Sequence, residues 1–295
     1  MKTFRTTHPA VSLLYFLCVT GFSMFFMHPV CLGVSFVCGF LFSLFLKGKS
    51  AIRTNLFYIL PLMLVTAAVN PLFNHQGITV LTYFPNGNPL TLESIIYGGF
   101  AALMLASVIC WFSCFNVIMT SDKIVYLFGK LSPSLSLIFS MTLRFVPRFF
   151  EQLKEITAAR RCIGKNLSEG GLATRIKNAL SLLSVLVSRS LENSIDTADS
   201  MKARGYGLSG RSVFSLFSFA KGDAILLCII LATGLTTLWG ALSASVSASF
   251  FPMIDFSFIT QNGIITLSAY TILCSLPLIL EIWEVFRWNS LKSKI

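Results

Sequence analysis

The chain carries few charged residues and very few acidic ones. Only 12% of its 295 residues are charged, and only 12 are Asp or Glu. A typical soluble domain has about 25% charged residues. A disordered or fibrous protein would be far less apolar, and an ordinary soluble enzyme of this length would carry more charge. The composition therefore excludes these classes and indicates a membrane protein.

Clusters of residues that ligate metals or perform nucleophilic catalysis are also missing. The three histidines are isolated, and the eight cysteines form no CxxC pair. Seven of the cysteines lie in apolar runs, which favours small membrane-buried residues over a disulfide framework. The chain has no GxxxxGK[ST] phosphate-binding loop. The sequence thus predicts no catalytic residue, no metal site and no cofactor.

The sequence does contain long apolar runs. Six of them are candidate membrane spans, because crossing about 30 Å of hydrocarbon takes about 20 apolar residues. The first run follows two basic residues, as in a signal peptide, but no small-x-small cleavage site follows it, so we interpret it as a retained span. The third run is short and contains a proline, so both a full span and a re-entrant segment remain open. The six runs are Val11–Met27, Val30–Leu46, Leu56–Val69, Ser94–Met119, Ala224–Leu242 and Gly263–Leu280, the last continuing to about Trp283.

All 23 lysines and arginines fall on one side of these six spans. The three loops on the other side hold no basic residue, and Glu93 and Asp255 are their only charges. Basic residues collect on the cytoplasmic side of membrane proteins. We therefore expect both termini in the cytoplasm. We also expect three regions: spans one to four in 1–121, a cytoplasmic or membrane-surface domain in 122–221, and spans five and six in 222–295.

The central region, 122–221, holds 15 of the basic residues and 7 acidic ones. Its apolar stretch Leu131–Phe150 contains two arginines and a proline, and counting it as a span would destroy the charge pattern. It is predicted to be a membrane-surface helix that leads into a cytoplasmic helix ending at Gly164. A second long helix is predicted over Ala173–Arg204, with an apolar stripe at helical spacing. The stripe consists of Ile176, Leu180, Leu183, Val187, Leu191, Ile195 and Ala198.

The ends of these two long helices resemble each other. The first reads Arg161-Cys162-Ile163-Gly164 and the second Arg204-Gly205-Tyr206-Gly207, and each continues to Leu-Ser and a glycine. Gly164 and Gly207 are the predicted helix stops. Basic residues are ordinary at helix C-termini because the helix dipole attracts them. A matched pair of arginine tips, however, also suits two equivalent grooves on a partner, such as a dimer, because arginine binds carboxylates and carbonyls bidentately.

Three segments resemble the transmembrane T component of energy-coupling factor transporters, the EcfT/CbiQ-like family. They are Thr142–Pro147, Ala159–Gly164 and Ser200–Gly207. The resemblance implies an all-α integral membrane protein of about six transmembrane helices, with a coupling domain of two long amphipathic helices. It also implies a non-catalytic subunit in a bacterial-type cell membrane. This subunit would connect two ABC-type ATPase subunits to a separate membrane subunit that binds a vitamin or a metal ion, and ATP-driven movement would release the cargo inside.

The family's coupling residues carry over to the two tips. Ala203, Arg204 and Gly205 match the Ala-Arg-Gly pattern of the second tip. The first tip departs from the pattern, because Arg160 and Arg161 are followed by a cysteine. The internal resemblance favours Arg161 as the coupling arginine, whereas Arg160 has the preceding alanine, so both remain candidates.

Two other classes of function compete with this one. A self-contained secondary transporter or a membrane-embedded enzyme would need charged groups inside its spans, and the predicted span interiors have none. A membrane-anchored binder of nucleic acid or anionic lipid would use the basic central region, but apolar stripes do not fit a plain solvated basic patch. The expected partners are therefore two ATPases, a substrate-binding subunit and the lipid bilayer, with no nucleic acid.

Overall fold

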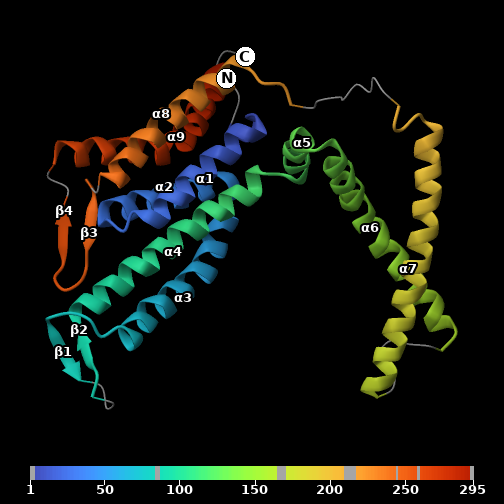
Figure 1. The fold of residues 1–295 in the computed structure, drawn as a ribbon, viewed down its shortest axis with the longest axis horizontal. Coiled ribbons are helices and arrows are strands. Elements are labelled where there is room, and N and C mark those ends of the chain that lie inside the picture. Colours follow the sequence, from blue (N-terminus) through green and yellow to red (C-terminus); the bar gives the residue numbers. More distant parts are fainter. Residues whose placement is uncertain are drawn as a thin grey trace. The chain divides into compact units, whose positions relative to one another are not determined.

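In a computed structural model of the chain, the residues described are 4–83, 87–164, 171–208, 217–243, 245–257 and 260–292. The chain divides into two compact units. The first combines residues 1–123 with residues 217–295, and the second contains residues 124–216. The N-terminal and C-terminal apolar helices thus belong to one body, and each unit is considered by itself below (Figure 1).

The described residues of the first unit form six apolar helices. Five are long and apolar enough to cross a membrane, and α1, with 17 residues, is a shorter apolar helix. The all-α membrane fold expected from the sequence is confirmed, while the count of six spans stays a prediction. The six helices are α1 (Pro9–Phe25), α2 (Pro29–Lys47), α3 (Lys49–Phe73), α4 (Leu92–Ile118), α8 (Lys221–Leu242) and α9 (Gln261–Lys292), and a short 3-10 helix, η1 (Phe4–Thr6), precedes them.

Helix α3 is longer than the apolar run that predicted it. The run has 14 residues, whereas α3 has 25 and continues through Pro61 and Pro71. It starts directly after Gly48, so this glycine is the whole connection, and Lys47 and Lys49 belong to the ends of α2 and α3. The weak third segment therefore belongs to a helix of membrane-crossing length.

Two helices of this unit begin with the same His-Pro pair. The Nδ1 atom of His8 accepts from the N–H of Ala10, and that of His28 accepts from the N–H of Val30, each at 3.3 Å. The proline that follows has no N–H and a fixed φ, so it suits the first helical position. The sequence indicates only a break at the second pair, but both histidines are N-caps.

The first unit is held together by close helix packing around α4, which contacts α1, α2 and α3, while α8 packs on α9 (Figure 1). Glycines permit the closest approaches. A Cβ on Gly98 of α4 would lie 2.9 Å from the carbonyl oxygen of Ala67 in α3. In the core, the buried Trp111 donates from Nε1 to the Oγ of Ser35 at 3.0 Å. Small residues and satisfied polar groups are what pack helices inside a bilayer.

Two short hairpins lie between helices of the first unit, and the sequence does not predict them. β1 (Val80–Tyr83) pairs with β2 (Pro89–Thr91), and β3 (Ser247–Ser249) pairs with β4 (Asp255–Ser257), both antiparallel. Both fall in the two longer loops that lack basic residues. Glu93, at the start of α4, accepts from the N–H of Thr79 at 3.2 Å and from its hydroxyl at 2.7 Å, which ties the first hairpin to the bundle.

Two long helices dominate the second unit. Helix α5 (Ser121–Leu131) enters it from the first unit, α6 (Pro133–Cys162) has 30 residues, and α7 (Leu172–Ala203) has 32. The expected surface helix and the cytoplasmic helix after it are one helix, since α6 continues without a break through Pro147. Figure 1 shows α6 and α7 crossing each other.

Candidate functional site

The first predicted tip lies at the end of α6. The N–H of Gly164 donates to the carbonyl of Arg161 at 3.0 Å, and Gly164 has a φ of 72°. A glycine in this left-handed conformation ends a helix at little cost because it has no Cβ. Arg161 and Cys162 therefore occupy the last turn of α6, and both side chains are exposed.

The second predicted tip, at the end of α7, has a complete cap. The N–H of Tyr206 donates to the carbonyl of Met201, and the N–H of Gly205 donates to that of Lys202, each at 3.0 Å. Gly205 has a φ of 81°. This pair of bonds around a left-handed glycine is the Schellman motif. Arg204 is thus the cap residue itself, with an exposed side chain.

This geometry corrects one expectation. Gly207 was predicted to stop the second helix, but Gly205 does so, because it is the first residue after the helix that adopts the left-handed conformation. The helix ends therefore align Gly164 with Gly205. Arg204 directly precedes its cap glycine, whereas Arg161 lies three residues before its own.

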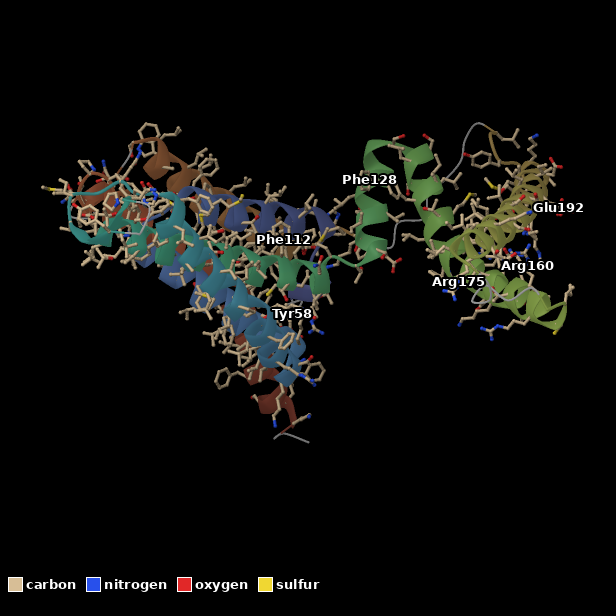
Figure 2. All side chains as sticks on the ribbon, turned by 90° about the horizontal axis from the view of Figure 1, so that it is seen from below. Tyr58, Phe112, Phe128, Arg160, Arg175 and Glu192 are labelled. Carbon is tan, nitrogen blue, oxygen red and sulfur yellow. The ribbon has the colours of Figure 1, made fainter. Side chains whose placement is uncertain are left out.

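Arg160 and Arg161 differ in their surroundings. The guanidinium of Arg160 donates from Nη1 to the carbonyl of Asn178 at 2.7 Å and from Nη2 to the hydroxyl of Ser181, so it fastens the end of α6 to α7 (Figure 2). Among the described residues, the guanidinium groups of Arg161 and Arg204 have no hydrogen-bonded or ion-paired partner. Of the three predicted coupling arginines, one is engaged within the unit, and two have guanidinium groups that bond to none of the described residues.

The contact between α6 and α7 is narrow and partly polar. Gln152 on α6 and Leu182 on α7 are the most buried described residues of these two helices, at 7% and 6% exposure. A small cavity between the two helices is lined by two phenylalanines, Arg148 and Gln152 of α6 and by polar residues of α7, namely Ser190, Asn193 and Ser194. One exposed ion pair, Arg189 with Glu155 at 3.8 Å, adds little.

The apolar stripe predicted on α7 is not covered by α6. Leu180, Leu191 and Ile195 are 62%, 62% and 63% exposed. Helix α6 carries a second uncovered set that the sequence reasoning missed. It comprises Ile138, Leu143, Val146 and Phe150. Apolar surface of this extent is typical of faces that contact other proteins or a membrane.

The described residues bring no three His, Cys, Asp or Glu side chains together as a metal site. All eight cysteines are free thiols, and Cys162 at the first tip is exposed. The features with functional promise are therefore the two free arginines and the uncovered apolar faces.

Comparison with known protein families gives this arrangement a context. The model of the CbiQ family, described as "Cobalt transport protein", matches residues 2–214. The chain belongs to the CbiQ family. The matched region includes four apolar helices, both long helices and both arginine tips, so the family expected from the three motif segments is confirmed.

Curated relatives carry a consistent name. The "Energy-coupling factor transporter transmembrane protein EcfT" of Lactobacillus helveticus is 38% identical over 103 residues, which are 34% of this chain and 37% of the relative. The EcfT of Bacillus selenitireducens is 34% identical over 98 residues, again 37% of the relative. The "EcfT 1" of Listeria monocytogenes is 27% identical over 218 residues, which are 67% of this chain and 80% of the relative. The CbiQ family match and these relatives are consistent with a multi-pass membrane protein.

Proposed function

We propose that the chain is the transmembrane coupling subunit of an energy-coupling factor transporter. In this role it transmits ATP-driven movement of two ABC-type ATPase subunits to a separate membrane subunit that binds the substrate, a vitamin or a metal ion. ATP hydrolysis belongs to the partners, and the chain itself is not an enzyme. The observation that carries the proposal is the pair of free arginines, Arg161 and Arg204, at the ends of two long helices.

The spacing of the tips supports two separate docking points. Arg160 binds α7 at Asn178 and Ser181, and Arg204 lies 23 residues beyond Ser181 along the same helix. At 1.5 Å per residue the tips are about 35 Å apart. One ATPase can therefore take each tip, with the arginine bound to carboxylates or carbonyls in a groove. The small residues Ala203 and Gly205 let the backbone approach that groove closely.

Arg161 is the better candidate for the first tip. Arg160 already donates two hydrogen bonds to α7. If Arg160 bound a partner instead, both of these hydrogen bonds would be lost. Arg161 is exposed in the last turn of α6. Arg160 then positions the tip, and Arg161 binds the partner.

The uncovered apolar faces of α6 and α7 suit the substrate-binding membrane subunit. Their leucine, isoleucine, valine and phenylalanine side chains need an apolar partner, whereas the ATPases are engaged through charge at the tips. The narrow, partly polar contact between α6 and α7 leaves the two helices able to change their mutual angle. The distribution of basic residues supports cytoplasmic termini in a bacterial-type cell membrane, with proteins and lipid as partners and no nucleic acid.

Co-purification with the two ATPase subunits tests the proposal. We expect the double variant Arg161→Ala and Arg204→Ala to lose both the ATPases and transport, because each buried charge-assisted contact is worth about 2–5 kcal/mol. The matched control removes two positive charges from the same helices, Lys154→Ala with Lys177→Ala, both exposed. If the arginine double variant assembles and transports as well as this control does, the proposed function is refuted.

A further inference from the structure

The chain leaves the first unit after Lys123 and returns to it at Phe217. These two connections join the second unit to the membrane bundle. Both lie next to one short N-terminal segment, Phe4–His8, here called the N-terminal clasp. All the contacts described below lie within the first unit.

The clasp is fixed to the bundle. Phe4 is fully buried, and its ring meets those of Tyr15, Phe16 and Phe42 edge-on, at centroid distances of 5.1, 6.1 and 6.0 Å. Arg5 donates from Nη2 to the carbonyl of Leu46, at the end of α2, at 2.8 Å. The clasp is therefore a folded part of the bundle that reaches the ends of several helices.

The outgoing connection is bound to the clasp by a lysine. The Nζ atom of Lys123 donates to the carbonyl of Arg5 at 2.8 Å, and only 4% of Lys123 is exposed. Burial lowers the pKa of this ammonium group. A buried ammonium is costly unless it is hydrogen-bonded, so this bond fixes the last residues of the first unit, at the start of α5, to the clasp.

The returning connection is bound to the same clasp by an aspartate. The N–H of His8 donates to Oδ1 of Asp223 at 3.3 Å, and the N–H of Ala220 donates to Oδ2 at 3.0 Å. Asp223 is 2% exposed. The rings of His8 and Phe219 meet edge-on at 5.3 Å. Residues before and within the first turn of α8 are thus fastened to the last residue of the clasp.

We propose that the N-terminal clasp holds both connections of the second unit to one rigid base, with Lys123 and Asp223 as its positioning residues. The proposal rests on the proposed coupling function. A movement of α6 and α7 can displace the helices of the first unit only if the two connecting segments stay fixed to that unit. Because both connections are attached to one five-residue segment, a displacement of one connection is transmitted to the other.

Hydrogen exchange on the purified chain in detergent tests the clasp without any partner. In Lys123→Met we expect about fivefold faster exchange of the amides of His8 and Ala220, because the whole clasp loosens. Neither amide is bonded to Lys123. Lys123→Arg, which keeps a long cationic donor, should restore slow exchange. The control Lys221→Met removes an exposed lysine beside the returning connection and should change nothing. Unchanged exchange in Lys123→Met would overturn the proposal.

The assembled transporter provides the second test. In proteoliposomes we expect Lys123→Met and Asp223→Ala each to lower the number of substrate molecules transported per ATP by about 3- to 10-fold, with the ATPases still bound. The double variant should be no worse than either single variant, because both act through one segment. Asp122→Asn, at an exposed aspartate, is the control. Multiplied losses in the double variant, or loss of assembly in the single variants, would contradict the clasp.

The two proposals fail in different ways. If the wild-type chain does not bind ATPases, the coupling function is wrong, and the exchange experiment still decides whether the clasp transmits loosening from Lys123 to His8. If the ATPases bind and exchange is unaffected, only the clasp is wrong.

Discussion

Trp111 in the first unit and Leu191 in the second are both large apolar residues on long helices, yet their surroundings are opposite. Trp111 is fully buried, with its indole N–H bonded to Ser35, whereas Leu191 is 62% exposed. The same contrast holds more widely. The first unit buries even charged groups such as Lys123 and Asp223, and the second leaves most of its apolar side chains uncovered. The first unit has its own buried core beneath exposed outer side chains such as Trp239, whereas Leu182 is the one buried apolar side chain among the described residues of the second unit. Under the proposed function, the second unit completes its packing with partner proteins.

The largest expected loss of stability comes from opening a cavity in the buried core of the first unit. Trp111→Ala removes a fully buried ring and leaves the Ser35 hydroxyl without its donor, so we expect a loss of about 3–5 kcal/mol in stability. Thermal unfolding in detergent, followed by helicity, measures it. The matched control is Trp239→Ala on α8, whose ring is 73% exposed and should matter little. Equal melting temperatures for the two variants would contradict the description of the first unit as having its own buried core.

Two adjacent leucines on α7 sharpen the contrast within the second unit. Leu182 is 6% exposed and Leu183 is 56% exposed. We expect Leu182→Ala to cost about 2 kcal/mol at the α6–α7 contact, and Leu183→Ala to stay within about 0.5 kcal/mol. Hydrogen exchange of α7 amides in the isolated chain resolves the difference. A similar response of both positions would mean that α7 packs on a different face.

The smallest effect separates the two arginines of the first tip. Arg160→Ala removes two hydrogen bonds to α7 that are at most partly buried and are together worth about 1 kcal/mol, and should speed exchange in the first three turns of α7. Arg161→Ala should leave that exchange unchanged and instead weaken ATPase binding. The reverse pattern would exchange the positioning and binding roles of the two residues.

Long, strongly patterned elements were predictable from the sequence. Apolar runs of membrane-crossing length identified α2, α4, α8 and α9, and helical spacing identified α7, because composition and period determine such helices locally. The hairpins were missed because strands of three or four residues carry too little alternation to detect. The direction of the α7 stripe was also beyond sequence reasoning, since it depends on which side of α7 meets α6.

At the two helix tips, the local sequence is not enough to predict which glycine ends the helix or which arginine is free. The sequence contains two glycines that could end α7, and both Gly205 and Gly207 adopt positive φ. The hydrogen bonds donated by the N–H groups of Gly205 and Tyr206 show that Gly205 ends the helix. The roles of Arg160 and Arg161 were equally open, because the acceptors of Arg160 belong to another helix. The sequence places Arg161 and Arg204 at the ends of α6 and α7, where the structure has them, and their docking role stays a prediction.

The uncovered faces of α6 and α7 have a consequence for the life of the chain in the cell. A subunit made without its partners exposes rows of leucine, isoleucine and phenylalanine. These rows favour aggregation and are recognised by membrane proteases. We expect the unassembled chain to be degraded quickly and to persist only in proportion to the partners made with it. Its half-life in pulse-chase labelling should lengthen when the partner genes are co-expressed. The surface proposed for coupling would then also adjust the amount of this subunit to the amount of its partners.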